Sequence, residues 1–188
     1  KKMVLKSNDN MMKYFIYDNI FTPDECELIV NSNHWRETEV KPASGYQANA
    51  NVYYFYDNKQ TEWIKNRISN SIKEVNDLYY QFEYSFFEEL KMIEYFEGYH
   101  FNWHIDIQGM NENFPKRKLQ SVTFLTDPKD YEGGKLRFNM AAKIPTIDLP
   151  QLQGSTVFYP SYMAHKVEPV TKGRRCIISA IVNGTPFR

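Results

Sequence analysis

Residues 95–106 read YFEGYHFNWHID, and the fold prediction starts from the end of this stretch. His104 and Asp106 are two positions apart, so on a strand their imidazole and carboxylate lie on one face. A second imidazole, His165, comes from a distant part of the chain. Two histidines and one carboxylate on one side of a metal leave its other positions open, which suits an Fe(II) ion that must bind O₂. An H-x-D pair alone is also common at the end of a surface strand, so its surroundings matter.

Length and composition limit the remaining choices. With 188 residues, we expect a single domain over 1–188 that buries a substantial core. Lysine plus arginine and aspartate plus glutamate number 23 each, so no basic field favours nucleic acid as a partner. No apolar run approaches the roughly 18 residues of a membrane span, and the first residues turn polar too soon for a signal peptide. Cys26 and Cys176 form no metal spacing and predict buried free thiols in a cytoplasmic protein. The oligomeric state is left open.

Helix signals dominate the first half of the chain and strand signals the second. Thr22-Pro23-Asp24-Glu25 forms a capping box that opens a helix to about Asn33. Apolar residues at helical spacing predict a longer amphipathic helix over 60–80. Short strands separated by glycine and proline are predicted at 13–17, 51–56, 89–95, 119–126, 135–139, 155–159, 165–170 and 175–182. This pattern indicates a mainly β (α+β) fold of the sandwich or jelly-roll kind, with residues 13–88 supporting a core over 89–184.

Four segments carry a resemblance to a known family. YFEGYHFNWHID fits the pattern Y-x-x-G-x-x-(Y/F)-x-x-H-x-D, and in it the chain resembles the prolyl 4-hydroxylase-like branch of the 2-oxoglutarate/Fe(II) dioxygenases. SVTFLTDPKDYEGGKLRF (121–138) and FYPSYMAHKVEPVTKGRR (158–175) look similar to the bacterial PKHD-type hydroxylases of that branch. The early FIYDNIF (15–21), followed by DEC (24–26), is similar to the family's N-terminal strand and helix. The likeness is weak between 33 and 88.

The resemblance implies a double-stranded β-helix, the jelly-roll or cupin-like core, and assigns roles to matching residues. His104, Asp106 and His165 match the iron ligands. Arg175 matches the basic residue that pairs with the distal carboxylate of 2-oxoglutarate, a task for which a guanidinium is well suited. Arg174 is the competing candidate. Alternate residues of a strand share a face, so we expect Arg174 to point away from the site.

Two further residues are candidates for holding 2-oxoglutarate. Tyr95 stands where the family uses a tyrosine hydroxyl, although an aromatic ring that fills the barrel is the alternative. Thr123 is expected to face inward with Ser121 and to donate a second hydroxyl, although a threonine in a strand needs no special role. Phe101 replaces a tyrosine that is common at its motif position, so any hydrogen bond from there is lost.

The implied cofactors are Fe(II), 2-oxoglutarate as co-substrate and O₂, and ascorbate is a candidate reductant. Three function classes remain open: a hydroxylase of peptidyl proline or another protein side chain, a dioxygenase of a free amino acid or other small molecule, and a non-enzymatic cupin-like binding module. The balanced charge weighs against a nucleobase demethylase. Substrate contacts are expected from the loops 41–51 and 108–118. The second loop, which includes the basic run at 116–118, is expected to form a mobile flap over the iron.

Overall fold

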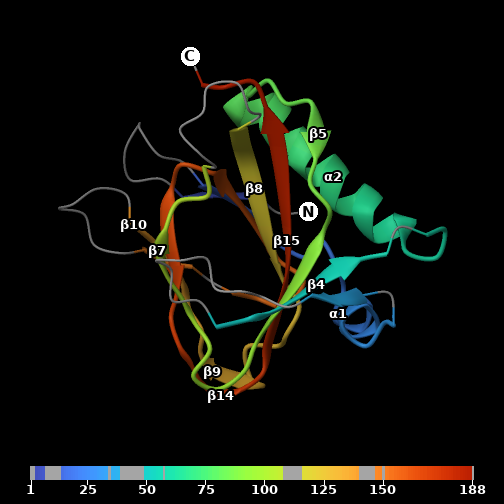
Figure 1. Ribbon diagram of the computed structural model, residues 1–188, viewed down its shortest axis with the longest axis vertical. Helices are drawn as coiled ribbons and strands as arrows, with labels where there is room; N and C mark the ends of the chain where they lie inside the picture. Colours follow the sequence, from blue (N-terminus) through green and yellow to red (C-terminus); the bar gives the residue numbers. More distant parts are fainter. Residues whose placement is uncertain are drawn as a thin grey trace.

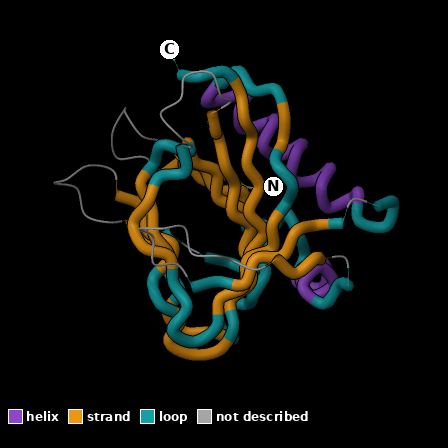
Figure 2. The backbone as a smooth tube through the Cα atoms, in the orientation of Figure 1, coloured by secondary structure: helices purple, strands orange, loops and turns teal. Residues whose placement is uncertain are grey.

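The computed structural model describes residues 3–6, 14–33, 35–38, 49–56, 58–107, 116–139, 147–149 and 151–187. Within these ranges the chain forms two facing antiparallel sheets, with the helices on one outer face (Figures 1 and 2). None of the helices in this part of the chain has the length and apolarity of a membrane span. Cys26 and Cys176 are both free and buried, as expected.

The larger sheet has nine strands within the described residues, in the order β1-β2-β12-β8-β15-β6-β4-β3, and β5 pairs with β15. Its central pair, β8 and β15, is buried almost throughout because both faces of the sheet are covered. The strands are β1 (Met3–Lys6), β2 (Tyr14–Tyr17), β3 (Trp35–Thr38), β4 (Asn51–Phe55), β5 (Phe86–Phe87), β6 (Lys91–Tyr95), β8 (Lys116–Phe124), β12 (Thr156–Pro160) and β15 (Arg175–Gly184).

The smaller sheet faces the larger one and carries two of the candidate ligands. In the described ranges its order is β11-β10-β13-β7, and β14 pairs separately with β9. The strands of the smaller sheet are β7 (Phe101–His104), β10 (Leu136–Asn139), β11 (Ile147–Asp148) and β13 (Ala164–Val167), and the separate pair is β9 (Tyr131–Gly133) with β14 (Val170–Gly173). Two facing antiparallel sheets are the jelly-roll arrangement that the strand spacing predicted.

The helices cover the face of the larger sheet that points away from the smaller sheet (Figure 1). They are α1 (Pro23–Val30), α2 (Glu62–Val75) and the π-helical turn η1 (Asn76–Tyr80). The capping box is confirmed: the Glu25 amide donates to Thr22 Oγ1 at 3.2 Å, and the Thr22 amide donates to Glu25 Oε2 at 2.9 Å. The first helix ends at Val30 rather than near Asn33.

Two apolar cores result from this layering. The first lies between the helices and the larger sheet, where the predicted apolar face of α2 is buried against residues of β8, β12 and β15. The second lies between the two sheets and contains Tyr95, Val122, Phe138, Tyr159 and Ile177, among others. The candidate site sits within this second core.

Candidate active site

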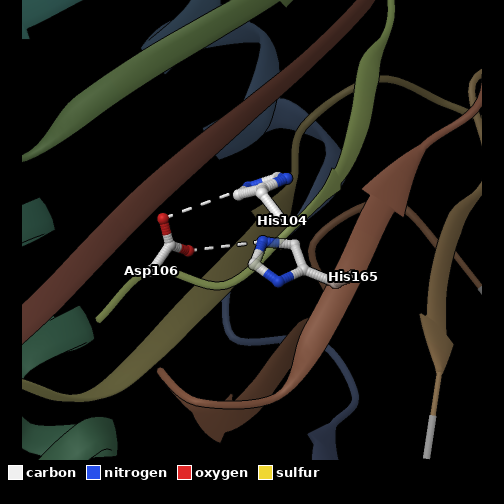
Figure 3. Close-up of side chains that lie close together, drawn as sticks. All are labelled: His104, Asp106 and His165. Carbon is white, nitrogen blue, oxygen red and sulfur yellow. Dashed lines mark ion pairs between the residues drawn. The ribbon is translucent and has the colours of Figure 1, made fainter. Parts of the chain in front are cut away.

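Two neighbouring strands bring the three predicted metal ligands together (Figure 3). His104 ends β7, Asp106 follows in the next loop, and His165 lies directly opposite His104 in β13. His165 Nε2 is 3.3 Å from Asp106 Oδ2, and His104 Nε2 is 4.0 Å from Asp106 Oδ1. The candidate ligand atoms all lie within 4.8 Å of one another. The distant histidine therefore reaches the H-x-D pair through strand pairing in the smaller sheet.

Backbone carbonyls orient both imidazole rings. His104 Nδ1 lies 2.7 Å from the Asn102 carbonyl oxygen, and His165 Nδ1 lies 3.0 Å from that of Met163. Because a carbonyl oxygen only accepts, each Nδ1 carries a hydrogen, so in a neutral ring Nε2 has its lone pair free for the centre of the cluster. Burial, followed by the neighbouring His165, lowers the pKa of His104 to about 4. His104 is therefore neutral near pH 7, the form in which histidine binds a metal.

The carboxylate of Asp106 stays ionised despite its burial. Burial raises the pKa of Asp106, but the interactions of its carboxylate with His165 and then with His104 outweigh this effect, so the pKa lies well below its usual range. The backbone of Asp106 is held separately: its amide donates to the Ser161 carbonyl oxygen at 2.9 Å, which fixes the chain just after β7. Two imidazole nitrogens and one anionic oxygen are a donor set that fits Fe(II).

The cluster opens into a cavity of about 460 Å³ between the two sheets. The smaller sheet supplies the two histidines, and the larger sheet supplies Tyr95, Arg175 and the residues that alternate with Arg175 along β15. Most of the remaining wall is apolar, including Val122, Leu136 and Val167.

Arg175 is a buried cation in this cavity that lacks an acidic partner within the described residues. Its side chain is among the largest that are fully buried, at 1% exposure. Nη2 donates to Gln151 Oε1 at 3.1 Å, whereas the buried Nε and Nη1 have no hydrogen-bond partner in the described part of the chain. Buried charged donors are normally paired, so this guanidinium fits a ligand carboxylate.

Arg174 lies on the opposite face of the chain, as the strand alternation predicted. Its guanidinium forms an ion pair with Glu94, and its side chain is 44% exposed. Arg174 and Cys176 border a separate, smaller cavity of about 230 Å³, whereas Arg175 and Ile177 border the cavity of the histidine cluster.

Tyr95 lies directly opposite Arg175 in the β6–β15 pair, and the Arg175 guanidinium carbon is 5.2 Å from the centroid of its ring. Burial raises the pKa of Tyr95 to about 12, so its hydroxyl keeps its proton and can donate. Tyr159, which the sequence prediction missed, also borders the cavity, with its ring centroid 5.0 Å from that of His165. Its place on the inward face of β12, two residues after Val157, was the available signal.

Thr123 is a correction to the sequence prediction, because it does not face the cavity. Its hydroxyl hydrogen-bonds with the hydroxyl of Thr156 at 2.7 Å, and these two residues are direct partners in β8 and β12. The β8 residues on the inward face are Gln120 and Val122, which border the cavity. Since neighbouring strand residues point to opposite faces, Thr123 belongs to the outward face of the larger sheet.

The basic run at 116–118 is a second correction. It begins β8 instead of lying in a solvated loop, and Lys116 and Lys118 are only 7% and 4% exposed. Arg117 borders the cavity. The rest of the predicted flap, residues 108–115, and most of the loop predicted over 41–51 lie outside the described residues.

Residues 90–183 match the family model of the 2OG-Fe(II) oxygenase superfamily. The chain belongs to this superfamily. The matched range contains three of the four segments that carried the resemblance, which is thus confirmed, and Fe(II), 2-oxoglutarate and O₂ are the cofactors that membership implies.

Curated relatives show which members of the superfamily this chain resembles. The chain is 43% identical over 82 residues to a PKHD-type hydroxylase of Gloeothece citriformis, which covers 43% of this chain and 36% of the relative. It is 40% identical over 86 residues to a PKHD-type hydroxylase of Pseudomonas paraeruginosa, with 43% and 37% covered. The similarity therefore spans little more than a third of the length of these relatives.

Solved structures confirm the predicted double-stranded β-helix. A prolyl-4-hydroxylase of Pseudomonas putida has a TM-score of 0.70 with 14% identity, covering 94% of this chain and 95% of that chain. A prolyl hydroxylase of Trichoplax adhaerens, solved with a hypoxia inducible factor peptide fragment, has a TM-score of 0.69 with 12% identity, covering 90% and 83%. At these identities the likeness concerns the fold.

Proposed function

We propose that this protein is an Fe(II)- and 2-oxoglutarate-dependent dioxygenase that hydroxylates an unactivated C–H bond, with peptidyl proline as its substrate. The observation that carries the proposal is the shared cavity of Arg175 and the histidine cluster. A buried guanidinium with two unpartnered donors suits a carboxylate, and the cluster suits a divalent metal. A binding module would need neither group.

The proposal gives each residue a role. His104, Asp106 and His165 would hold Fe(II), which together with 2-oxoglutarate and O₂ supplies the oxidising chemistry. Arg175 would bind the distal carboxylate of 2-oxoglutarate through its guanidinium, which has unpartnered donors in the described part of the chain, with the Tyr95 hydroxyl as a further donor. Carbonyl contacts at Nδ1 keep both rings oriented.

The substrate assignment rests on similar proteins. The curated relatives are named PKHD-type hydroxylases, and the solved structures include prolyl hydroxylases from a bacterium, a virus and an animal. We further propose that residues 1–188 act as a single domain, in which 13–88 support the β-helix core over 89–184. Ascorbate as reductant and a cytoplasmic location complete the proposal, the second supported by the two free cysteines.

Turnover of 2-oxoglutarate tests the proposal directly. Succinate would be measured with Fe(II), proline-containing peptides and free amino acids, and products would be checked by mass spectrometry for the gain of one oxygen atom. We expect substrate-stimulated succinate and a hydroxylated peptidyl proline, and neither with His165→Ala. Oxygen gained only by a free amino acid would replace the substrate assignment, and absence of 2-oxoglutarate turnover with all of them would contradict the reaction class.

A further inference from the structure

Arg117 at the start of β8 reaches the candidate metal site from the larger sheet. The pairing of β8 with β15 shifts register between Val182 and Asn183, which interrupts the alternation of β8 at this point. As a result Arg117 borders the cavity, while the ammonium of Lys118 lies 3.8 Å from the centroid of the Phe187 ring. Arg117 Nη1 is 3.7 Å from Asp106 Oδ1.

Glu88 holds the guanidinium of Arg117 in a fixed orientation. Arg117 Nε donates to Glu88 Oε1 at 2.6 Å and Nη2 donates to Oε2 at 2.8 Å, a bidentate pair. Asn183 Nδ2 also donates to Oε1 at 2.9 Å, and Lys91 Nζ donates to Oε2 at 3.3 Å. The Arg117 and Glu88 side chains are only 14% and 17% exposed. Two nitrogens of the fork are thus occupied, and the third is directed at Asp106.

We propose that Arg117, held by Glu88, is a positioning residue that fixes the carboxylate of Asp106 at the metal site. Asp106 is the one candidate ligand outside a strand, so its side chain depends on neighbours for its orientation. Groups that orient metal ligands in this way commonly change metal affinity or activity by 10–100-fold when removed. The inference rests on the proposed metal site and adds a residue to it.

Two effects of Arg117 on metal binding have opposite signs, which makes the inference testable. A cation near a divalent ion repels it, so loss of the charge alone would tighten metal binding. Loss of a positioning contact would weaken metal binding, because Asp106 would then have to be ordered when the metal binds. The direction of the change in affinity therefore separates a positioning role from a purely electrostatic one.

Co(II) titration of the full chain, followed by absorption spectroscopy, measures this direction without turnover. We expect Arg117→Ala to bind Co(II) about 10–100-fold more weakly, with an altered ligand-field spectrum. Glu88→Gln should weaken binding less, and adding it to Arg117→Ala should cause no further loss, because the two residues act as one unit. The matched control is Arg67→Ala, which removes a similar 2.6 Å pair with Glu25 on the helical side of the larger sheet and should leave Co(II) binding unchanged.

Each remaining outcome counts against the inference. Tighter Co(II) binding by Arg117→Ala would show an electrostatic role, and unchanged binding with weaker substrate binding would make Arg117 a substrate contact. If Arg117→Ala alone does not fold because Glu88 is left unpaired, the Arg117→Ala/Glu88→Gln variant removes that charge and gives the same reading. Wild-type protein that binds no Co(II) or Fe(II) would overturn the proposed function as well, whereas unchanged binding by the variants alone would overturn only this inference.

Discussion

Replacing Arg175 by methionine should change protein stability and co-substrate binding in opposite directions. In the metal-free protein two buried donors of Arg175 lack partners within the described residues, at a cost of about 1–3 kcal/mol each. The hydrogen bond to Gln151 and the contacts with the Tyr95 and Phe124 rings stabilise the buried guanidinium by about 2–4 kcal/mol, which offsets part of that cost. The centres of these two ranges differ by about 1 kcal/mol, so we expect Arg175→Met to raise the free energy of unfolding by about 1 kcal/mol, which corresponds to a rise in Tm of about 2–4 °C.

The same substitution should weaken the binding of 2-oxoglutarate. Loss of a buried, charged partner of a carboxylate costs about 2–5 kcal/mol, which corresponds to an increase in Kd of about 30-fold to 4,000-fold. Thermal unfolding of the metal-free protein and calorimetric titration of the Co(II)-loaded protein with 2-oxoglutarate measure the two effects. Chelation by the metal should leave some residual binding.

Arg174→Met is the matched control, since it changes the adjacent residue on the opposite face of the chain. Arg174 pairs with the buried carboxylate of Glu94, so its loss should lower stability and leave 2-oxoglutarate binding unchanged. Weaker 2-oxoglutarate binding by Arg174→Met, with normal binding by Arg175→Met, would refute the assignment. A large loss of stability in metal-free Arg175→Met would refute the description of this guanidinium as uncompensated.

Three further predictions concern a metal ligand, a glycine beside Arg175 and an ion pair between the helices. His165→Ala should abolish Co(II) binding and 2-oxoglutarate turnover while Tm changes by only a few degrees; near-wild-type decarboxylation would contradict the ligand assignment. Gly134→Ala should raise the Kd for 2-oxoglutarate and lower Tm, because its Cβ would lie 2.8 Å from Arg175 Cδ at a φ of +58°, and an unchanged Kd would show that Arg175 can shift freely. The hydrogen bond from Arg67 lowers the pKa of Glu25 below its ordinary value of 4.5, so Glu25 stabilises the fold above that pH and loses this contribution as the pH falls through its folded pKa. The Tm of Glu25→Gln should therefore fall less than that of the wild type as the pH is lowered. An equal fall in the two proteins would exclude this contribution.

Features that depend on a few neighbouring residues could be predicted from the sequence. The capping box at Thr22 follows from residues within one helical turn. The common face of His104 and Asp106, and the opposite faces of Arg174 and Arg175, follow from the two-residue period of an extended chain. Because these geometries are set by local backbone conformation, they need no knowledge of the neighbouring strands.

Which of two neighbouring strand residues faces the cavity, by contrast, depends on the tertiary structure. Whether Thr123 or its neighbours in β8 face the cavity depends on which strands lie beside β8 and in what register, and the pairing with Thr156 in β12 turned Thr123 outward. A register shift against β15 likewise turned Arg117 into the cavity. The sequence by itself determined which residues could bind a metal and a carboxylate, because that depends on side-chain chemistry and local spacing. Strand pairing decided that His165 lies opposite His104 and that Glu88 clamps Arg117, since these contacts join segments that are far apart along the chain.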